Sequence, residues 1–296
     1  MKMSKLNVGV IGSGNIGSDL LVKITRSQHL ECKIFCGRNL ESPGMQFAQQ
    51  KEVNVSDRSI DALIEQTDLD IIFDATSAET HFENLSKLES TGALIIDMTP
   101  AKTGFLCVPD INLEEAVKER NVNMITCGGQ ASVPIALAIC KGLQDLPKYI
   151  ETISTIASLS AGTGTRDSLD EYIKTTQLAL KKFSGVKNTK ALINLNPATP
   201  PINMSTTVMV ETEETHLTQV TIEVQKCVDR LQRYIPGIHI KVHPVYDDRR
   251  SAVVTTIGVT GMGDYLPSYA GNLDIINCAG IMVAESYAKS RNNEDI

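Results

Sequence analysis

The sequence predicts an α/β protein with a doubly wound parallel sheet of the Rossmann type, followed by a mixed α/β domain built on an antiparallel sheet. Buried-strand and helical patterns alternate over residues 6–126, which is typical of a parallel sheet covered by helices on both faces. In residues 150–159 and 253–260 apolar and polar residues alternate instead, as in antiparallel strands with one exposed face. A chain of 296 residues is long enough for two such domains.

Composition narrows the classes of function. Charged residues make up 21% of the chain and the net charge is −7, which argues against binding to nucleic acid or to an anionic membrane surface. No signal-peptide segment opens the chain and no apolar run reaches the ~18 residues of a membrane span, so we expect a cytoplasmic protein. Its seven cysteines are then expected to be free thiols. Cys32 and Cys36 lie four apart without a second pair or a nearby His, so no metal site is expected.

The first predicted strand, residues 6–11, runs into a glycine loop and then a helix over residues 15–27. A GxGxxG spacing between a strand and a helix indicates dinucleotide binding, and a structural glycine turn is the alternative. The glycines permit a tight turn, a close approach of the pyrophosphate and close helix packing, while the helix N-terminus faces the phosphates. The predicted cofactor contacts are Gly12, Ser13, Gly14, Asn15, Ile16 and Gly17.

The second predicted strand, residues 31–36, is followed by Arg38. Sites selective for NAD usually carry an Asp or Glu here, whereas an Arg accommodates the 2′-phosphate of NADP. Arg38 is therefore a predicted cofactor contact that leaves NADP use open. A solvated loop cation is the alternative.

The next elements complete the parallel sheet. Strands are predicted over residues 52–56, 69–74, 93–97 and 122–126, and helices over residues 57–66 (capped by Asp57), 79–88 and 113–120. Thr76 and Ser77 follow a strand end, where ligands bind in such sheets, so they are candidate cofactor contacts or simple helix caps. His81, in the helix after them, is more often structural than catalytic in such a place.

Cys127 lies where the strand over residues 122–126 ends and a buried helix, predicted over residues 133–146, begins beyond Gly128 and Gly129. The unpaired N–H groups of a helix N-terminus stabilise a thiolate, which predicts a lowered pKa and a nucleophilic Cys127. The glycines allow a substrate to approach the backbone. A buried structural cysteine is the alternative.

The second half is expected to contain fewer helices and an antiparallel sheet. Strands are predicted over residues 150–159, 191–195, 206–211 and 253–260, with helices ending near residue 183 and covering residues 217–233. Residues 160–166 form a loop of small residues, after which Asp167 or Ser168 caps a helix. A last helix, residues 275–289, is expected to return to the first domain.

Six segments carry a resemblance to a known family: residues 10–17, 74–77, 123–131, 160–166, 196–201 and 265–275. With its CGGQA and GNLDI motifs, the chain resembles the acylating acetaldehyde dehydrogenases. These convert acetaldehyde, NAD and coenzyme A into acetyl-CoA and NADH. In the breakdown of aromatic hydrocarbons they pair with a 4-hydroxy-2-oxovalerate aldolase.

The resemblance implies a role for particular residues. Cys127 matches the cysteine that carries the acyl thioester, residues 13–16 match the pyrophosphate loop, and Asn272 matches an asparagine that reaches the nicotinamide. A second cofactor loop is implied at Ser160, Ala161, Gly162, Thr163, Gly164, Thr165, Arg166, Asp167 and Ser168. Thr206 departs from the family, which commonly has an Asp there that is suspected as an acid/base. Thr163 replaces a usual Pro, and residues 244–254 look shorter than in typical members.

The resemblance also implies a domain plan and partners. We expect an NAD(P)-binding domain over residues 1–130, a catalytic and dimerisation domain over residues 131–268, and a returning C-terminal helix over residues 269–296. Expected partners are a small aldehyde, coenzyme A, a second copy of the chain and an aldolase subunit. Two alternatives remain: a semialdehyde dehydrogenase-like enzyme that uses an acyl phosphate, and a catalytically impaired cofactor-binding partner of an aldolase.

Overall fold

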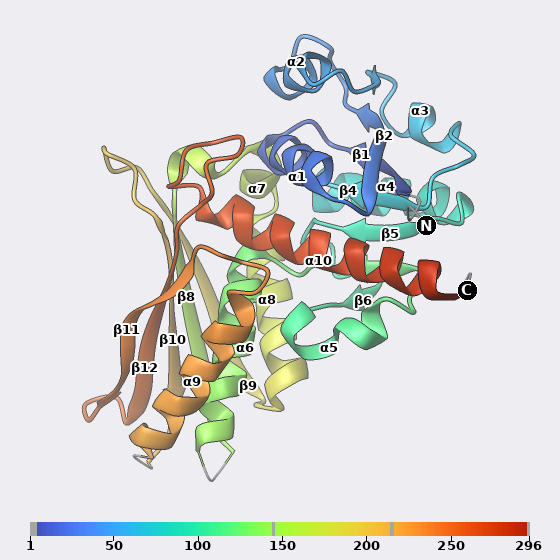
Figure 1. Cartoon of the computed structure of the whole chain (residues 1–296). Coiled ribbons are helices and arrows are strands. Elements are labelled where there is room, and N and C mark those ends of the chain that lie inside the picture. Colours follow the sequence, from blue (N-terminus) through green and yellow to red (C-terminus); the bar gives the residue numbers. More distant parts are fainter. Residues whose placement is uncertain (1–4, 144–145, 214–215, 295–296) are drawn as a thin grey trace.

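The chain forms two sheets and a long C-terminal helix (Figure 1). The computed structural model describes residues 5–143, 146–213 and 216–294. Over the described residues the first sheet is parallel and has the strand order β3-β2-β1-β4-β5-β7-β6. The chain runs outward from β1 to β3 and then returns to lie beside β1 as β4. Ligands bind at such a switch point, at the carboxyl ends of the strands.

The first domain contains these elements: β1 (Leu6–Ile11), α1 (Asn15–Arg26), β2 (Leu30–Cys36), α2 (Pro43–Gln50), β3 (Val55–Ser56), α3 (Ile60–Ile64), β4 (Ile71–Asp74), α4 (Ala78–Ser90), β5 (Leu94–Asp97), β6 (Phe105–Leu106), α5 (Pro109–Ala116) and β7 (Asn121–Asn123). The predicted doubly wound sheet is confirmed. The four residues of β4 are all buried, and so are the four of β5, because helices cover both faces of a parallel sheet.

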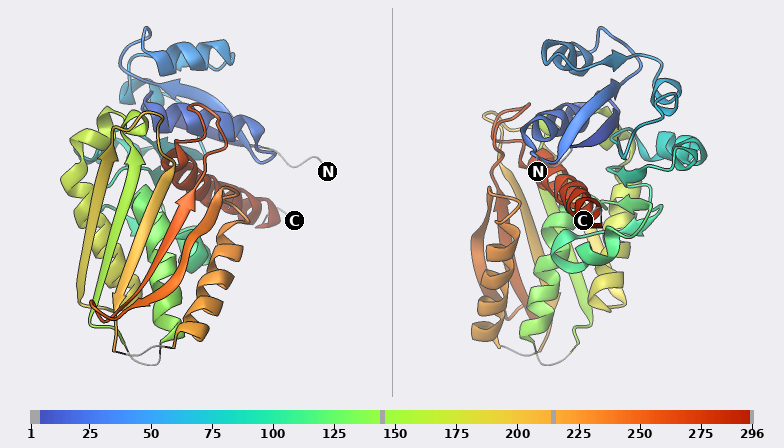
Figure 2. Two further views of the ribbon diagram at one scale, coloured as in Figure 1. Left: turned by 90° about the vertical axis from the view of Figure 1, so that its left-hand side faces the viewer. Right: turned by 45° about the vertical axis from the view of Figure 1, so that its right-hand side comes forward.

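The second sheet has the order β11-β12-β10-β8-β9 within the described residues, and its strands are antiparallel except for the pair β8 and β9. Its strands and the remaining helices are α6 (Cys127–Gly142), β8 (Tyr149–Ala157), the 3-10 turn η1 (Ser158–Ser160), α7 (Thr163–Asp167), α8 (Leu169–Ser184), β9 (Asn188–Asn196), β10 (Met204–Glu211), α9 (Leu217–Leu231), β11 (Ile238–Asp247), β12 (Ala252–Val259) and α10 (Gly271–Glu294). Helices α6, α8 and α9 cover one face, and the opposite face is open toward the viewer on the left of Figure 2. This confirms the predicted mixed domain.

Helix α10 returns to the first domain, as predicted. Its residues Ile276, Ala279 and Val283 join the buried apolar cluster between α1 and the parallel sheet. The Asn277 amide donates hydrogen bonds to the carbonyl oxygen of Ile16 (3.1 Å) and to Asp19 Oδ2 (2.8 Å). The last helix therefore packs directly against the helix that begins at the glycine loop.

Several element predictions were wrong in detail. Helix α3 spans residues 60–64 and is preceded by Ser59 at φ 50°, so Asp57 is not its cap. Helix α6 begins at Cys127, six residues before the predicted start. It ends at Gly142, and residues 144–145 of the predicted helix lie outside the described residues. Helix α5 begins four residues earlier than predicted, and helix α2 and strands β6 and β11 were not predicted. Gly128, Gly129 and Pro134 disfavour a helix by propensity, but tertiary packing overrides such preferences.

Among the described residues, no helix is both long enough and apolar enough to cross a lipid bilayer.

A buried lysine joins α1, α10 and the segment between β12 and α10. Lys23 Nζ lies 2.6 Å from Asp19 Oδ2, 2.8 Å from Asp264 Oδ2 and 2.8 Å from Asp274 Oδ1, and Arg26 also pairs with Asp264. Burial alone would lower the pKa of Lys23, but the surrounding carboxylates outweigh it and raise that pKa above its ordinary value. The three carboxylates are close enough together to hold a cation, and the ammonium group supplies one.

We expect Lys23→Met to destabilise the protein by about 3–5 kcal/mol, because removing one partner leaves buried carboxylates without a counter-charge. Urea unfolding at pH 7 measures the change. The matched control is Lys33→Met, which removes an exposed pair with Glu31 and should leave the unfolding midpoint nearly unchanged. Equal midpoints for the two variants would contradict a stabilising role for Lys23.

Candidate active site

Cys127 lies between the end of a strand and a helix, as the sequence predicted, and it is itself the first residue of α6. The hydroxyl of Thr126 caps the helix by accepting a hydrogen bond from the Gly129 N–H (2.8 Å). The preceding residue, Ile125, has φ 64°, which for a β-branched side chain is a strained conformation that costs about 1–3 kcal/mol. Asn123 Oδ1 holds this turn by accepting a hydrogen bond from the Ile125 N–H (2.8 Å). The backbone before the cysteine is thus fixed by side-chain contacts.

The residue after the cysteine must be a glycine. A Cβ on Gly128 would lie 2.0 Å from the hydroxyl oxygen of Tyr172 and 2.5 Å from Ser154 Oγ. Tyr172 comes from α8 and Ser154 from β8, so the second domain presses directly on the start of α6. The Tyr172 hydroxyl oxygen lies 3.7 Å from Cys127 Sγ, within the range of a weak sulfur hydrogen bond.

A pocket of about 50 Å³ opens at Cys127. It brings together seven of the residues predicted for the site: Cys127, Ile16, Thr76, Gly164, Thr165, Ser168 and Asn272. Further lining comes from Met98, Thr99, Pro100, Ile125, Thr126, Tyr172 and Ile276. The cysteine therefore shares one cavity with both predicted cofactor loops and with the first turn of α10.

The glycine loop has the geometry that a pyrophosphate requires. Gly12 has φ 107°, and a Cβ on Gly17 would lie 1.9 Å from the carbonyl oxygen of Gly12, so neither position accepts a side chain. The space where a Cβ of Gly14 would stand is open to 4 Å. The second loop lies against the first, because the Asn15 amide donates a hydrogen bond to the carbonyl oxygen of Ser160 (3.3 Å).

The buried Asn272 side chain supports a ligand in the same cavity. Its Oδ1 atom is buried without a hydrogen-bond partner, although Asn272 lines the pocket. A buried acceptor without a partner is costly, and a ligand N–H group would satisfy it.

The other predicted cofactor residues lie outside the pocket lining. Arg38 is exposed at the end of β2, next to Gly37, whose Cβ would meet Ser13 Oγ at 2.7 Å. Ser77 caps α4, which is the simpler of its two predicted roles. Arg166 donates hydrogen bonds to the carbonyl oxygens of Ala161 and Ser158 and so holds its own loop together. Gly12, Ser13, Gly14, Asn15, Gly17, Ser160, Ala161, Gly162, Thr163 and Asp167 also lie outside it.

The expected fall in the thiol pKa is wrong for this structure. Burial raises the pKa of Cys127 to about 11, although hydrogen bonds from the Tyr172 hydroxyl and from the N–H groups of Gly128 and Cys127 act to lower it. The helix N-terminus does stabilise the thiolate, as predicted, but the loss of solvation is larger. Burial also raises the pKa of Cys140 to about 11, and those of the other cysteines to about 12.

A chain of hydroxyl groups runs from the cysteine to Thr206. The Tyr172 hydroxyl is hydrogen-bonded to Ser154, and Ser154 Oγ lies 3.0 Å from Thr206 Oγ1. Thr206 is 1% exposed, so solvent does not hydrate the far end of the chain. Position 206, where the family that this chain resembles commonly has an Asp, is thus connected to Cys127. The connection consists of hydroxyl groups alone.

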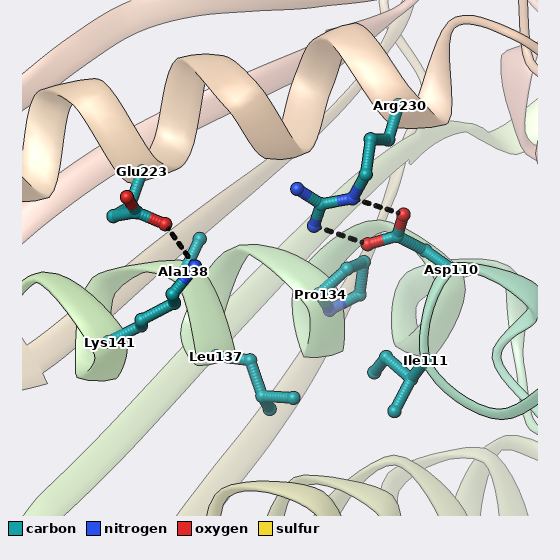
Figure 3. Close-up of a pocket in the computed structure, with 8 residues that line it drawn as sticks. All are labelled: Asp110, Ile111, Pro134, Leu137, Ala138, Lys141, Glu223 and Arg230. Carbon is teal, nitrogen blue, oxygen red and sulfur yellow. Dashed lines mark hydrogen bonds and ion pairs between the residues drawn. The ribbon is translucent and has the colours of Figure 1, made fainter.

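A larger hollow of about 350 Å³ lies along α6, between α5 and α9 (Figure 3). Its floor is Ile111, Pro134, Leu137 and Ala138, and its charged groups already pair: Arg230 with Asp110 (2.8 Å for both contacts) and Lys141 with Glu223 (2.7 Å). This hollow is larger than the pocket at Cys127, but it is not the candidate active site, because neither Cys127 nor the predicted cofactor loops line it.

Sequence reasoning missed the pocket residues that other elements contribute. Met98, Thr99 and Pro100 follow β5, and the rule that ligands bind at the carboxyl ends of parallel strands would have found them. Tyr172 reaches Cys127 from α8, and no local motif marks it.

Two family models match the chain. Residues 127–267 match the model "Prokaryotic acetaldehyde dehydrogenase, dimerisation", and residues 7–119 match "Semialdehyde dehydrogenase, NAD binding domain". Relatives named acetaldehyde dehydrogenase match nearly the whole length of the chain. The Pectobacterium atrosepticum protein is 51% identical over 97% of both chains, and the Spirochaeta aurantia protein is 46% identical over 98% of this chain and 97% of its own.

Solved structures show the same fold. Aspartate semialdehyde dehydrogenase from Candida albicans superposes with a TM-score of 0.65 at 11% identity, covering 98% of this chain and 99% of its own. The Vibrio cholerae enzyme of the same name superposes with a TM-score of 0.60 at 14% identity, covering 95% of this chain and 98% of its own.

We expect the rate of Cys127 alkylation to increase with pH, with the midpoint of the increase at about pH 11. Tyr172→Phe should move that midpoint up by about one pH unit, because a hydrogen bond to a charged group contributes about 1.5–3 kcal/mol and one pKa unit is 1.36 kcal/mol. Iodoacetamide labelling, read on the Cys127 peptide by mass spectrometry, measures it. Tyr149→Phe, which loses a contact with Glu151 on β8, is the control. An unchanged or lower midpoint in Tyr172→Phe would show that this hydroxyl does not stabilise the thiolate.

Proposed function

This chain belongs to the prokaryotic acetaldehyde dehydrogenases, an NAD-dependent enzyme family, and from that premise we propose that it makes acyl-CoA from a short aldehyde through a thioester on Cys127. The observation that carries the proposal is the position of Cys127, at the N-terminus of α6 in a pocket shared with both predicted cofactor loops. Acetaldehyde is the proposed substrate.

The chain's own residues fit a nicotinamide dinucleotide. The glycine loop, residues 12–17, would hold the pyrophosphate at the N-terminus of α1, and the buried Asn272 Oδ1 would accept a hydrogen bond from a carboxamide. The bound cofactor supplies a hydride acceptor. The proposal includes NADP, because the exposed Arg38 follows β2, where an arginine accommodates a 2′-phosphate.

In the first half of the reaction, the Cys127 thiolate attacks the aldehyde carbon and forms a thiohemiacetal. The Gly129 N–H is taken by the Thr126 cap, so the N–H groups of Cys127 and Gly128 would stabilise the resulting oxyanion, because the first turn of a helix leaves them without an intrahelical partner. Loss of a hydride from the same carbon leaves an acyl thioester on Cys127. One proton is released in this half, namely the one that the thiol carried.

In the second half, the thiol of coenzyme A attacks the thioester and Cys127 leaves. The incoming thiol loses one proton and the departing Cys127 thiolate takes up one, so no net proton is released. Exchange between two thiols does not need the strong base that hydrolysis requires. A buried pocket also keeps water from the thioester.

Phosphate is the alternative acyl acceptor, as the fold shared with aspartate semialdehyde dehydrogenases would allow. An acyl phosphate requires an anion site beside the cysteine. The described residues that line the pocket include no Lys, Arg or His, which favours a thiol acceptor over phosphate.

The matched dimerisation model indicates a homo-oligomer. We propose that a second copy packs on the open face of the second sheet, and that an aldolase subunit supplies the aldehyde. A cytoplasmic location is proposed with these partners, because free cysteines persist in a reducing compartment.

Cys127→Ala should abolish NADH formation that depends on acetaldehyde and coenzyme A, since the loss of a covalent nucleophile typically costs many orders of magnitude. Absorbance at the NADH band measures turnover, with coenzyme A or phosphate as acceptor and with NAD or NADP. The control is Cys140→Ala, on the same helix outside the pocket lining. Turnover in Cys127→Ala would end the thioester proposal, and turnover with phosphate instead of coenzyme A would favour the alternative.

Met209→Arg should convert the dimer into a monomer, because it places a charge on the open face of the sheet, where Met209 lies with Ile153, Thr207 and Val254. Light scattering after gel filtration measures the mass, which should fall from twice the monomer value to the monomer value. Leu178→Arg, at an exposed apolar position on α8, is the control. If Met209→Arg remains a dimer, subunits contact one another through another surface.

A further inference from the structure

Three neighbouring strands of the first sheet end in the same local structure. Asp74 Oδ1 at the end of β4 accepts a hydrogen bond from the Thr76 N–H (3.0 Å), and Asp97 Oδ1 at the end of β5 accepts one from the Thr99 N–H (2.7 Å). Asn123 at the end of β7 holds the Ile125 N–H in the same way (2.8 Å). The three backbone groups held in this way belong to residues that line the pocket at Cys127.

One buried histidine connects these turns. His81, from α4, places Nδ1 2.9 Å from Asp74 Oδ2 and Nε2 2.8 Å from Thr103 Oγ1 and 3.4 Å from Asp97 Oδ2. The side chains of His81, Asp74 and Asp97 are fully buried.

Asp97 carries the connection onward to β7. The amide of Asn123 donates hydrogen bonds to Asp97 Oδ2 (2.6 Å) and to the carbonyl oxygen of Thr99 (2.9 Å). His81 is thus linked through Asp97 and Asn123 to the Ile125 N–H, two residues before Cys127.

The hydrogen-bond pattern accommodates a His81 ring whose two nitrogens are both donors. Asp74 offers only an acceptor, and the Thr103 hydroxyl donates its proton to Asp97 (3.3 Å), so Thr103 Oγ1 accepts from Nε2. Burial would lower the pKa of His81, but the hydrogen bond to Asp74 and the charges of Asp97, Asp74 and Glu89 outweigh it and raise the pKa. These contacts favour the charged form of His81 between Asp74 and Asp97, beneath the pocket, while burial raises the pKa of Asp97 to about 6.

We propose that His81 is a positioning residue for the active site, which fastens the turns after β4, β5 and β7 and thereby fixes Thr76 and the strained Ile125 around Cys127. The role of His81 in catalysis rests on the proposed function. Its effects on cofactor binding and thiol reactivity can be measured whether or not the enzyme turns over.

Two conservative variants separate the two arms of the network. An Asn side chain reproduces the Nδ1 donor of a histidine, so His81→Asn keeps the link to Asp74 and loses the link to Thr103 and Asp97. A Gln side chain reproduces the Nε2 donor, so His81→Gln keeps the second link and loses the first. Thr91→Ala is the control, because it removes two hydrogen bonds at the far end of the same helix.

The measurements are the NAD dissociation constant by calorimetry, the iodoacetamide rate of the Cys127 peptide, and the unfolding temperature. We expect His81→Asn to bind NAD within about threefold of the wild type and to alkylate at least about 10-fold more slowly, since small displacements at a reacting group have effects of this size. His81→Gln should weaken NAD binding at least about 10-fold and keep the alkylation rate.

A purely structural histidine predicts a different outcome: both variants lower the unfolding temperature, as Thr91→Ala does, and neither changes binding or alkylation. That result would overturn the proposal. Thr103→Val covers the case in which the histidine variants do not fold, because it removes only the hydroxyl between His81 and Asp97 at a partly exposed position. It should slow alkylation and keep NAD binding, and unchanged alkylation in it would also overturn the proposal.

Discussion

The contact between Tyr172 and the first turn of α6 is the constraint on which the site depends. The tyrosine hydroxyl occupies the space of a side chain at position 128, which requires a glycine there and brings α8 against Cys127. Cys127 itself follows β7 at the carboxyl edge of the parallel sheet. The cysteine sulfur thus lies at the junction of the two domains, and neither domain alone forms its surroundings. The return of α10 completes the junction, because it adds Asn272 to the same pocket.

Burial at this junction has two opposed chemical effects. It raises the pKa of the Cys127 thiol, which reduces the thiolate fraction near neutral pH, and it limits the access of water to a thioester. A thiolate of higher pKa is also the stronger nucleophile once it is formed. The hydrogen bonds from Tyr172 and from the first N–H groups of α6 offset part of the burial cost. In the proposed mechanism, such a site favours a protected thioester over a permanently ionised thiol.

Much of the fold and part of the site follow from local sequence patterns. The glycine loop, the strands before it and after it, and the strand-to-helix position of Cys127 depend on neighbouring residues, so the sequence predicts them. Helix α6 began earlier than expected because its two glycines gain more from tertiary contacts than they lose in propensity. The direction of the pKa shift was wrong because burial depends on Tyr172 and other groups distant in the sequence. The contacts of His81 were not predicted for the same reason: its two carboxylate partners lie at the ends of separate strands.

A proton balance shows which role the hydroxyl chain that ends at Thr206 can have in the proposed reaction. Each of the hydroxyls of Tyr172, Ser154 and Thr206 can pass a proton along, but none of them can take up and hold an additional proton near neutral pH. Formation of the thioester releases one proton, which must leave the site, whereas exchange with an incoming thiol releases none. A carboxylate at position 206 could hold the released proton temporarily, but burial would raise its pKa, so a larger fraction would already be protonated and unable to accept another proton. Since the second half of the proposed reaction needs no net base, a threonine at this position is compatible with acyl transfer to a thiol, and less so with hydrolysis.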